Sequence, residues 1–180
     1  VISMGGLVVF NSIRTAGDKF DDAIAAYLKK AYNIQIGERT AEKIKIQIGC
    51  AMKLDKADEM DVKGSDLTTG LPRTIRINSD EMAIAIEEPI TKIIDGIKFT
   101  LEQTKPELAA DIIDKGIVLT GGGAQLRNFD KKLREETGVP VHIGESPQEC
   151  VVKGAGKMLE EQLDVLRRLS FEGEETHIAS

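Results

Sequence analysis

The sequence is most informative at the stretch Ile117-Val118-Leu119-Thr120-Gly121-Gly122-Gly123-Ala124-Gln125. Its three leading apolar residues predict a short buried strand, and the glycines predict a sharp turn into a helix that begins near Ala124. A strand that ends in this way presents bare backbone N–H groups at the start of the helix, where they can donate hydrogen bonds to an anion. The stretch therefore predicts either a nucleotide or phosphate site or a tight turn that binds nothing.

The residues after this turn continue the alternation of helix and strand. This helix is predicted to carry Leu126, Phe129 and Leu133 on its apolar side and to end at Gly138, with a second strand at 139–143. Ser146 is expected to begin a last helix. Strand–helix–strand–helix is typical of an α/β fold with a parallel, covered sheet. The apolar stripe of the last helix is Val151, Ala155, Met158, Leu159, Leu163 and Leu166.

The first half of the chain has a different pattern. Two apolar runs on either side of a Gly-Gly pair predict a β-hairpin at the N-terminus. Two amphipathic helices are expected next, the first capped by Asp18 and the second by Thr40. A second hairpin is predicted from 62–67 and 71–77. Because 34–78 is more polar than its surroundings, it is predicted to be a smaller lobe inserted into the α/β unit.

Prolines and a glycine divide the middle of the chain. Ser79 begins the longest predicted helix, and Pro89 falls inside it, where a proline kinks or breaks a helix. Pro106 suits the first turn of a short helix that ends at Gly116.

Composition and charge exclude several classes of function. The net charge is −6 and the pI is about 5.1, without a local run of Lys and Arg, which argues against a nucleic-acid binder. Cys50 and Cys150 match no metal or redox spacing and are expected to be free thiols in a reducing compartment. No apolar run has the roughly 20 residues of a spanning helix, and no signal peptide is recognised. The sequence predicts a cytosolic protein.

Two further places could contact a ligand. Glu42 and Lys45 lie three positions apart on one face of a predicted helix, so they could meet a ribose and a purine or form a surface ion pair. Gly17, between a strand and a helix, could approach a ligand or serve only as a turn. The segment 154–157 is not a phosphate loop, because Val151 stands where that motif needs glycine and Met158 where it needs Ser or Thr.

The chain resembles the MreB family of bacterial actin homologues. The resemblance rests on a set of motifs whose order and spacing match over nearly the whole sequence, and which are specific only when taken together. These motifs are Ser12–Asp18, Ile36–Lys45, Asp66–Arg73, Asp111–Ile117, Leu119–Gly123 and Lys153–Gly156.

The resemblance implies an α/β fold of the actin-like ATPase type, which is ribonuclease H-like, with an inserted α+β lobe and a C-terminal helix. It assigns 1–19 and 82–150 to one large subdomain and 20–81 to the smaller insertion. It assigns 151–180 to the opposite large subdomain. The implied function is a filament-forming cytoskeletal protein that binds ATP with Mg²⁺, hydrolyses it slowly and controls cell shape from the inner face of the membrane.

The resemblance also implies a nucleotide site. Glu42 and Lys45 correspond to adenosine contacts, the three glycines to the adenosine and phosphate loop, and Gly17 to a position near the nucleotide. The expected nucleotide-binding residues are Gly17, Glu42, Lys45, Gly121, Gly122, Gly123, Ala124 and Gln125. No catalytic or metal-binding residue is expected in this chain.

The sequence lacks two phosphate loops of the family and the residues that hold Mg²⁺ in it. It therefore corresponds to the C-terminal half, with one wall of the ATP cleft, and the chain alone is expected not to hydrolyse ATP. Expected partners are further copies of the protein, cell-wall synthesis and membrane shape proteins, and the membrane through elements outside this chain. Two alternatives stay open: an interaction domain that binds no nucleotide, and a related sugar-kinase or chaperone ATPase.

Overall fold

The computed structural model describes residues 1–161 of the 180-residue chain. The helices are α1 (Gly17–Tyr32), α2 (Glu38–Ile48), α3 (Ser79–Ala85), α4 (Glu87–Glu102), α5 (Pro106–Lys115), the 3₁₀ turn η1 (Gly122–Gln125), α6 (Phe129–Thr137) and α7 (Cys150–Glu161). The strands are β1 (Ile2–Ser3), β2 (Gly6–Leu7), β3 (Ile34–Gln35), β4 (Glu59–Asp66), β5 (Pro72–Asn78), β6 (Ile117–Leu119) and β7 (Val141–Ile143). Helices and sheets alternate in an α/β fold, as predicted.

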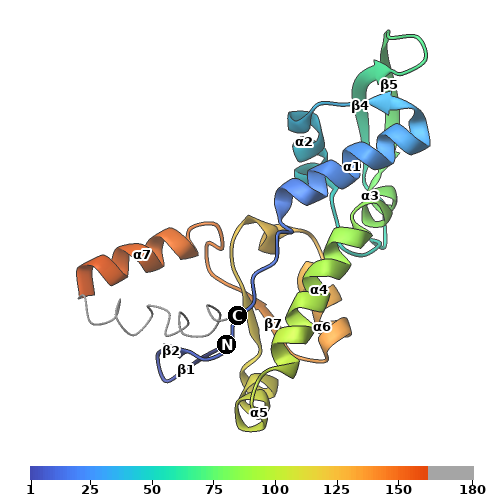
Figure 1. The fold of residues 1–180 in the computed structure, drawn as a ribbon. Coiled ribbons are helices and arrows are strands. Elements are labelled where there is room, and N and C mark those ends of the chain that lie inside the picture. The colour runs from blue at the N-terminus through green and yellow to red at the C-terminus, as the bar shows by residue number, and fades with distance from the viewer. Residues whose placement is uncertain (162–180) are drawn as a thin grey trace, which may run out of the picture.

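Figure 1 shows an elongated molecule. Helices α1, α2 and α3 lie with strands β4 and β5 toward one end, and α4, α5, α6 and β7 lie toward the other. Helix α7 extends to one side, away from both groups. The order β3-β4-β5 forms an antiparallel sheet at the first end, and β6 pairs with β7 in parallel at the second.

Both predicted hairpins are present, although the first turns at Met4-Gly5 rather than at the Gly-Gly pair, because Gly6 already belongs to β2. In the first, Ile2 pairs with Leu7. In the second, Val62 pairs with Ile75, and the strands extend over most of the predicted residues. The tip of this hairpin is held by Asp66, whose carboxylate oxygen Oδ1 accepts hydrogen bonds from the N–H groups of Thr68 and Thr69 at 2.9 and 3.0 Å.

The predicted helix caps are wrong. Helix α1 follows Ala16, which is extended and makes no side-chain cap, so Asp18 lies inside the first turn. Helix α2 follows Gly37, and the Thr40 N–H donates to the Gly37 carbonyl within the first turn. An acidic residue in the first turn still interacts favourably with the positive end of the helix dipole, which explains why Asp18 suits a helix start without capping it.

The long predicted helix is broken, as Pro89 indicates. Helix α3 ends at Ala85 and α4 starts at Glu87, with Ile86 between them outside helical geometry. Proline has no N–H for the carbonyl of the residue four positions earlier, here Ala85, and its ring crowds that carbonyl. Pro106 and Gly116 bound α5 as predicted.

The hydrophobic core is concentrated in the first half of the chain. In the described part of the chain, the largest fully buried side chains are Phe20, Ile24, Leu28, Ile34, Ile44, Cys50, Val62, Ile77, Met82, Ile86, Ile90 and Leu133. All of them except Leu133 lie between residues 20 and 90. The same cluster continues through Ile94 to Leu126, Phe129 and Val141, so α4 and α6 pack on it too.

The parallel strands β6 and β7 confirm the predicted strand–helix–strand unit, but the prediction of a covered sheet is wrong. Val118 in β6 is 62% exposed and Ile143 in β7 is 47% exposed. The helix after the glycines also starts later than predicted: α6 begins at Phe129, because Asn128 adopts a left-handed conformation with φ 59° that an α-helix cannot include.

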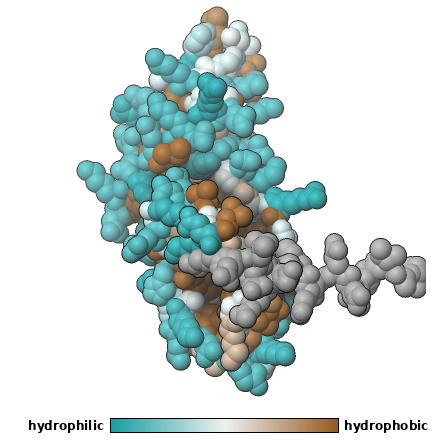
Figure 2. Space-filling view, turned by 90° about the vertical axis from the view of Figure 1, so that its left-hand side faces the viewer, coloured by the Kyte–Doolittle hydropathy of each residue, from teal (hydrophilic) through white to brown (hydrophobic). Residues whose placement is uncertain are grey.

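The last helix is exposed along its apolar side. It begins at Cys150 rather than Ser146, and Val151, Val152 and Leu159 are 71%, 67% and 79% exposed. Figure 2 shows hydrophobic residues gathered on the lower half of the face it presents. Leu163 and Leu166 of the predicted stripe lie outside the described residues. Within residues 1–161, no helix is both long and apolar enough to cross a membrane.

Candidate nucleotide site

The glycine turn joins β6 to η1 through one residue with a restricted conformation. Gly121 has φ 82° and ψ 172°, which side chains of L-residues rarely allow, and its N–H donates to the Pro147 carbonyl at 2.7 Å. The chain then closes into η1, where the Ala124 N–H donates to the Gly121 carbonyl at 3.2 Å. The stretch therefore forms the predicted turn, with a 3₁₀ helix in place of an α-helix.

The side of this turn that carries Gly122 and Gly123 is open. Both residues are exposed. A Cβ added at Gly123 would meet no atom within 4 Å, and one at Gly122 would meet only Gln148 Nε2 at 3.9 Å. The packing of the protein therefore does not require glycine at these two positions. Open space over N–H groups that begin a helical turn suits the close approach of a ligand oxygen.

Ala124 and Gln125 connect the turn to the rest of the protein. Ala124 is 3% exposed and belongs to the buried core. Gln125 is exposed, and its Oε1 accepts a hydrogen bond from Gln148 Nε2 at 3.0 Å. Gln148 lies in the segment between β7 and α7, as does Pro147, which holds the Gly121 N–H. This one segment thus holds the turn at two points.

Lys45 connects α2 to the start of α1. Its Nζ donates to Asp21 Oδ2 at 2.7 Å and to the Gly17 carbonyl at 3.2 Å. The two side chains are 18% and 9% exposed, so this is a largely buried ion pair. The second carboxylate oxygen of Asp21 is buried without a hydrogen-bond partner among the described residues. Gly17 and Lys45, both predicted site residues, are therefore in contact.

Glu42 has a different environment. It is exposed on α2, one turn before Lys45. Among the ion pairs of residues 1–161, none joins Glu42 to Lys45, since Lys45 pairs with Asp21 instead. The surface ion pair left open by the sequence is therefore not formed.

Arg127 joins the glycine turn to helix α2, which carries Glu42 and Lys45. Its carbonyl accepts a hydrogen bond from the Ala51 N–H at 2.8 Å, and its backbone forms a parallel bridge with Cys50. Cys50 and Ala51 follow the end of α2, whereas Arg127 lies two residues beyond η1. The backbone after the glycine turn thus runs directly against the end of the helix that carries Glu42 and Lys45.

Sequence reasoning missed Asp21, Arg127 and Gln148. Asp21 had a signal, because a carboxylate next to Phe20 at the edge of an apolar helical stripe is expected to be buried and paired. Arg127 and Gln148 had none, because their partners are backbone carbonyls, the Asp58 carboxylate and an amide that only the folded chain brings near. The cysteines are free, and burial raises the pKa of the Cys50 thiol.

Known proteins resemble this chain in sequence and structure. A family model described as MreB/Mbl protein matches residues 1–167. The cell shape-determining protein MreB of Escherichia coli strain K12 is 49% identical over 160 residues, which cover 89% of this chain and 46% of that protein. The cell shape-determining protein Mbl of Bacillus subtilis strain 168 is 48% identical over 160 residues, which cover 89% of this chain and 48% of that protein.

A solved structure gives the same result for the fold. The crystal structure of MreB 5 of Spiroplasma citri bound to AMPPNP matches with a TM-score of 0.85 and 38% identity, over 90% of this chain and 50% of that one. The chain thus spans about half the length of the relatives it matches. With a family match over almost its whole length, this chain belongs to the MreB/Mbl family of cell shape-determining proteins and has their actin-like fold.

Proposed function

We propose that this chain supplies one wall of an adenine-nucleotide cleft in an actin-like cytoskeletal protein. The observation that carries the proposal is the open backbone at Gly122 and Gly123, next to the end of α2. In the proposal, this turn faces the phosphates while Glu42 and Lys45 on α2 contact the nucleoside. A family member solved with AMPPNP supports the choice of ligand.

The contacts of Lys45 refine its proposed role. An ammonium group has three N–H donors. Lys45 uses two of them, one on Asp21 and one on the Gly17 carbonyl, which leaves one for a ligand. Lys45 therefore acts mainly by fixing α2 against the start of α1 and offers a single hydrogen bond to the nucleoside. Gly17 contributes through this contact. Glu42, which is exposed, is the freer of the two α2 residues to meet a ribose hydroxyl.

Magnesium does not fit the described residues. Across residues 1–161, no three His, Cys, Asp or Glu side chains gather where they could hold a metal ion. We propose that Mg²⁺ accompanies the nucleotide in the complete protein and is held by segments outside this chain. Mg²⁺ held there would neutralise charge on the nucleotide phosphates. This chain contributes backbone N–H donors and a fixed nucleoside wall.

At the level of the cell, the proposal is a filament-forming protein that controls cell shape. It would assemble with further copies of itself at the inner face of the membrane and guide cell-wall synthesis through its partners. Family membership supports this assignment, because the matched relatives are cell shape-determining proteins. In the same proposal, 1–19 with 82–150 is the large subdomain, 20–81 the insertion and 151–180 part of the opposite subdomain.

The test is the substitution Gly122→Val in the complete protein that contains this chain. A branched Cβ over the turn would displace a ligand oxygen, and two lost charge-assisted hydrogen bonds would weaken ATP binding about a hundredfold or more. Glu42→Ala, which removes one nucleoside contact, should weaken binding less. ATP titration with a thermal melt of each variant measures both effects.

The matched control is Gly6→Val in β2, a position without positive φ where a Cβ meets only the Ser3 carbonyl, at 3.7 Å. It should leave ATP affinity unchanged. Normal ATP binding by Gly122→Val would show that the glycines form only a turn. If the unsubstituted protein bound no nucleotide, an interaction domain would become the better assignment.

A further inference from the structure

Arg127 holds together two segments that are far apart in the sequence. Its guanidinium Nε donates to the Gly49 carbonyl at 3.2 Å and its Nη2 donates to the Gln47 carbonyl at 2.9 Å. Its Nη1 pairs with the carboxylate of Asp58. These contacts add to the backbone bonds between Arg127 and the chain after α2.

The chemistry of this contact is specific to arginine. Helix α2 ends at Ile48, and the last carbonyls of a helix lack partners within it. A cation at this end is also stabilised by the helix dipole. The planar fork of a guanidinium reaches two carbonyls and a carboxylate together, which the single nitrogen of lysine cannot do. The Asp58 side chain is 51% exposed, so that ion pair by itself adds little stability.

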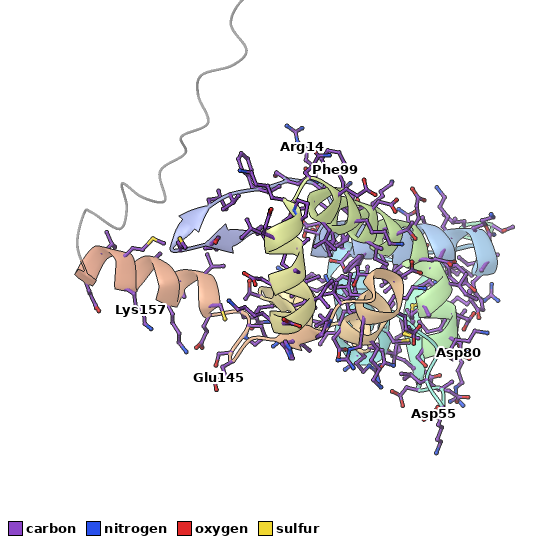
Figure 3. The ribbon with its side chains drawn as sticks, turned by 90° about the horizontal axis from the view of Figure 1, so that it is seen from below. Arg14, Asp55, Asp80, Phe99, Glu145 and Lys157 are labelled. Atoms are coloured by element: carbon purple, nitrogen blue, oxygen red, sulfur yellow. The ribbon has the colours of Figure 1, made fainter. Side chains whose placement is uncertain are left out.

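The acceptors of Arg127 are themselves fixed. The Asp58 N–H donates to Ser79 Oγ at 3.1 Å, and the Ser79 N–H donates to the Asp58 carbonyl at 2.9 Å. Buried Cys50 donates its thiol hydrogen to the Ser79 carbonyl at 3.2 Å. Ser79 begins α3, so Asp58 links Arg127 to the start of α3 as well. Figure 3 shows Asp80, the next residue, at the same end of the molecule as Asp55 and opposite Glu145 and Lys157.

We propose that Arg127 is a positioning residue that sets the separation between the glycine turn and α2. Gln125 lies two residues before it, and Lys45 lies in the last turn of the helix whose end it binds. The inference rests on the proposed function, in which a nucleotide spans these two segments. Arg127 touches no ligand; it fixes the two halves of the site at the spacing that one ligand needs.

Ligands of different length test this role. In the complete protein, Arg127→Lys should weaken ADP binding about tenfold or more, since a ligand that bridges two segments gains affinity from their fixed spacing. Adenosine, which reaches only α2, and pyrophosphate, which reaches only the turn, should each change less than about threefold, because each half-site is intact. Isothermal titration of the three ligands gives this split.

Two further variants make the result decisive. Asp58→Asn removes the negative charge that pairs with Arg127 and should reproduce the split in weaker form. Arg76→Lys also breaks a two-nitrogen arginine contact, in this case with Asp61. Because no hydrogen bond among the described residues joins Arg76 to a carbonyl of α2, this variant should leave all three affinities unchanged. Equal losses for the three ligands in Arg127→Lys would indicate a general structural role and overturn the proposal.

Hydrogen exchange without nucleotide separates this proposal from the proposed function. Arg127→Lys should speed the exchange of amides in both 47–51 and 121–125, while those of β4 and β5 stay protected. Unchanged exchange in both segments would overturn the proposal even if ATP binds. Faster exchange with no ADP binding by the unsubstituted protein would refute the nucleotide assignment, and with it the positioning role, while leaving the contact itself established.

Discussion

At the scale of single residues, Glu81 links α1 to α3. Its Oε1 accepts hydrogen bonds from the hydroxyls of Tyr32 and, at 3.4 Å, Tyr27. Its Oε2 accepts the Asn78 N–H at 2.9 Å, and the Asn78 side chain accepts the Glu81 N–H at 3.0 Å in return. One carboxylate thus caps α3 and holds the C-terminal half of α1 against it.

This contact predicts a loss of stability in alkali. The hydrogen bond to Glu81, helped by burial, raises the pKa of Tyr32 from 10.0 to about 12. Because the folded state holds this proton more tightly, the contribution is complete below the ordinary pKa and disappears as the pH rises toward about 12. Denaturant unfolding should show the free energy of unfolding falling over this range, and Tyr32→Phe should remove most of the fall.

Tyrosinate absorbance gives a direct check, because the chain has two tyrosines and no tryptophan. The difference between the titrations of the unsubstituted protein and Tyr32→Phe isolates Tyr32. A midpoint near 10 in the folded protein would refute the prediction.

The glycine turn and the partner of Lys45 also show what the sequence alone cannot predict. Three consecutive glycines predict a turn, and the turn is present. The sequence does not distinguish Gly121, whose backbone requires glycine, from Gly122, whose φ is not positive. Lys45 likewise had Glu42 as its obvious partner three residues away, but the buried Asp21 on another helix took its place. Local spacing cannot rank a neighbour against a residue that tertiary packing delivers.

At the scale of elements, the junction of α5 and β6 depends on Gly116. Its φ of 80° and ψ of −177° belong to a region essentially reserved for glycine. A Cβ there would stand 2.6 Å from the Pro140 carbonyl, which accepts the Ile117 N–H at 2.7 Å and so aligns β6 with β7. The junction leaves room for hydrogen only.

Gly116→Ala is therefore expected to lower the free energy of unfolding by about 2 kcal/mol or more, from backbone strain alone. Denaturant unfolding measures the change. The control is Gly156→Ala in α7, where a Cβ meets nothing within 4 Å and should favour the helix by about 0.5–1 kcal/mol. Equal stability of Gly116→Ala and the unsubstituted protein would contradict the geometry of this junction.

The element boundaries at Pro89, Pro106 and Gly116 were predictable, and those that depend on tertiary context were not. Pro89 and Pro106 restrict the backbone directly, so the break after α3 and the start of α5 follow from covalent geometry. The starts of α1 and α2 were missed because Asp18 and Thr40 suit both a cap and a first turn. The late start of α6 depends on a left-handed Asn128, which the sequence does not indicate.

At the scale of the whole molecule, the parallel sheet has an uncovered face. Strands in parallel sheets are normally buried on both faces, but Val118 and its register partner His142, which lie on the same face, are both exposed here. The matched MreB of Escherichia coli is about twice as long as the region it shares with this chain. An ATP site that needs two walls would draw on both parts of such a protein.

The 180-residue chain alone is therefore predicted to hydrolyse ATP no faster than a protein-free blank. Phosphoryl transfer depends on Mg²⁺ and on phosphate loops that position the reacting groups, and one glycine turn does not replace them. Phosphate release measured with Mg²⁺ tests this, beside a Gly122→Val chain purified in the same way. Mg²⁺-dependent release that tracks the chain and is lost in the variant would refute the prediction.

The uneven distribution of the core has a consequence for how the polypeptide is made. Within residues 1–161, nearly all of the fully buried large side chains lie between residues 20 and 90, so they emerge from a ribosome before β6, the glycine turn or α7 has been translated. Domains tend to fold as units during synthesis, earliest segments first. The α1–α3 region can thus bury its apolar surface early, and the glycine turn is then added to a surface that already exists.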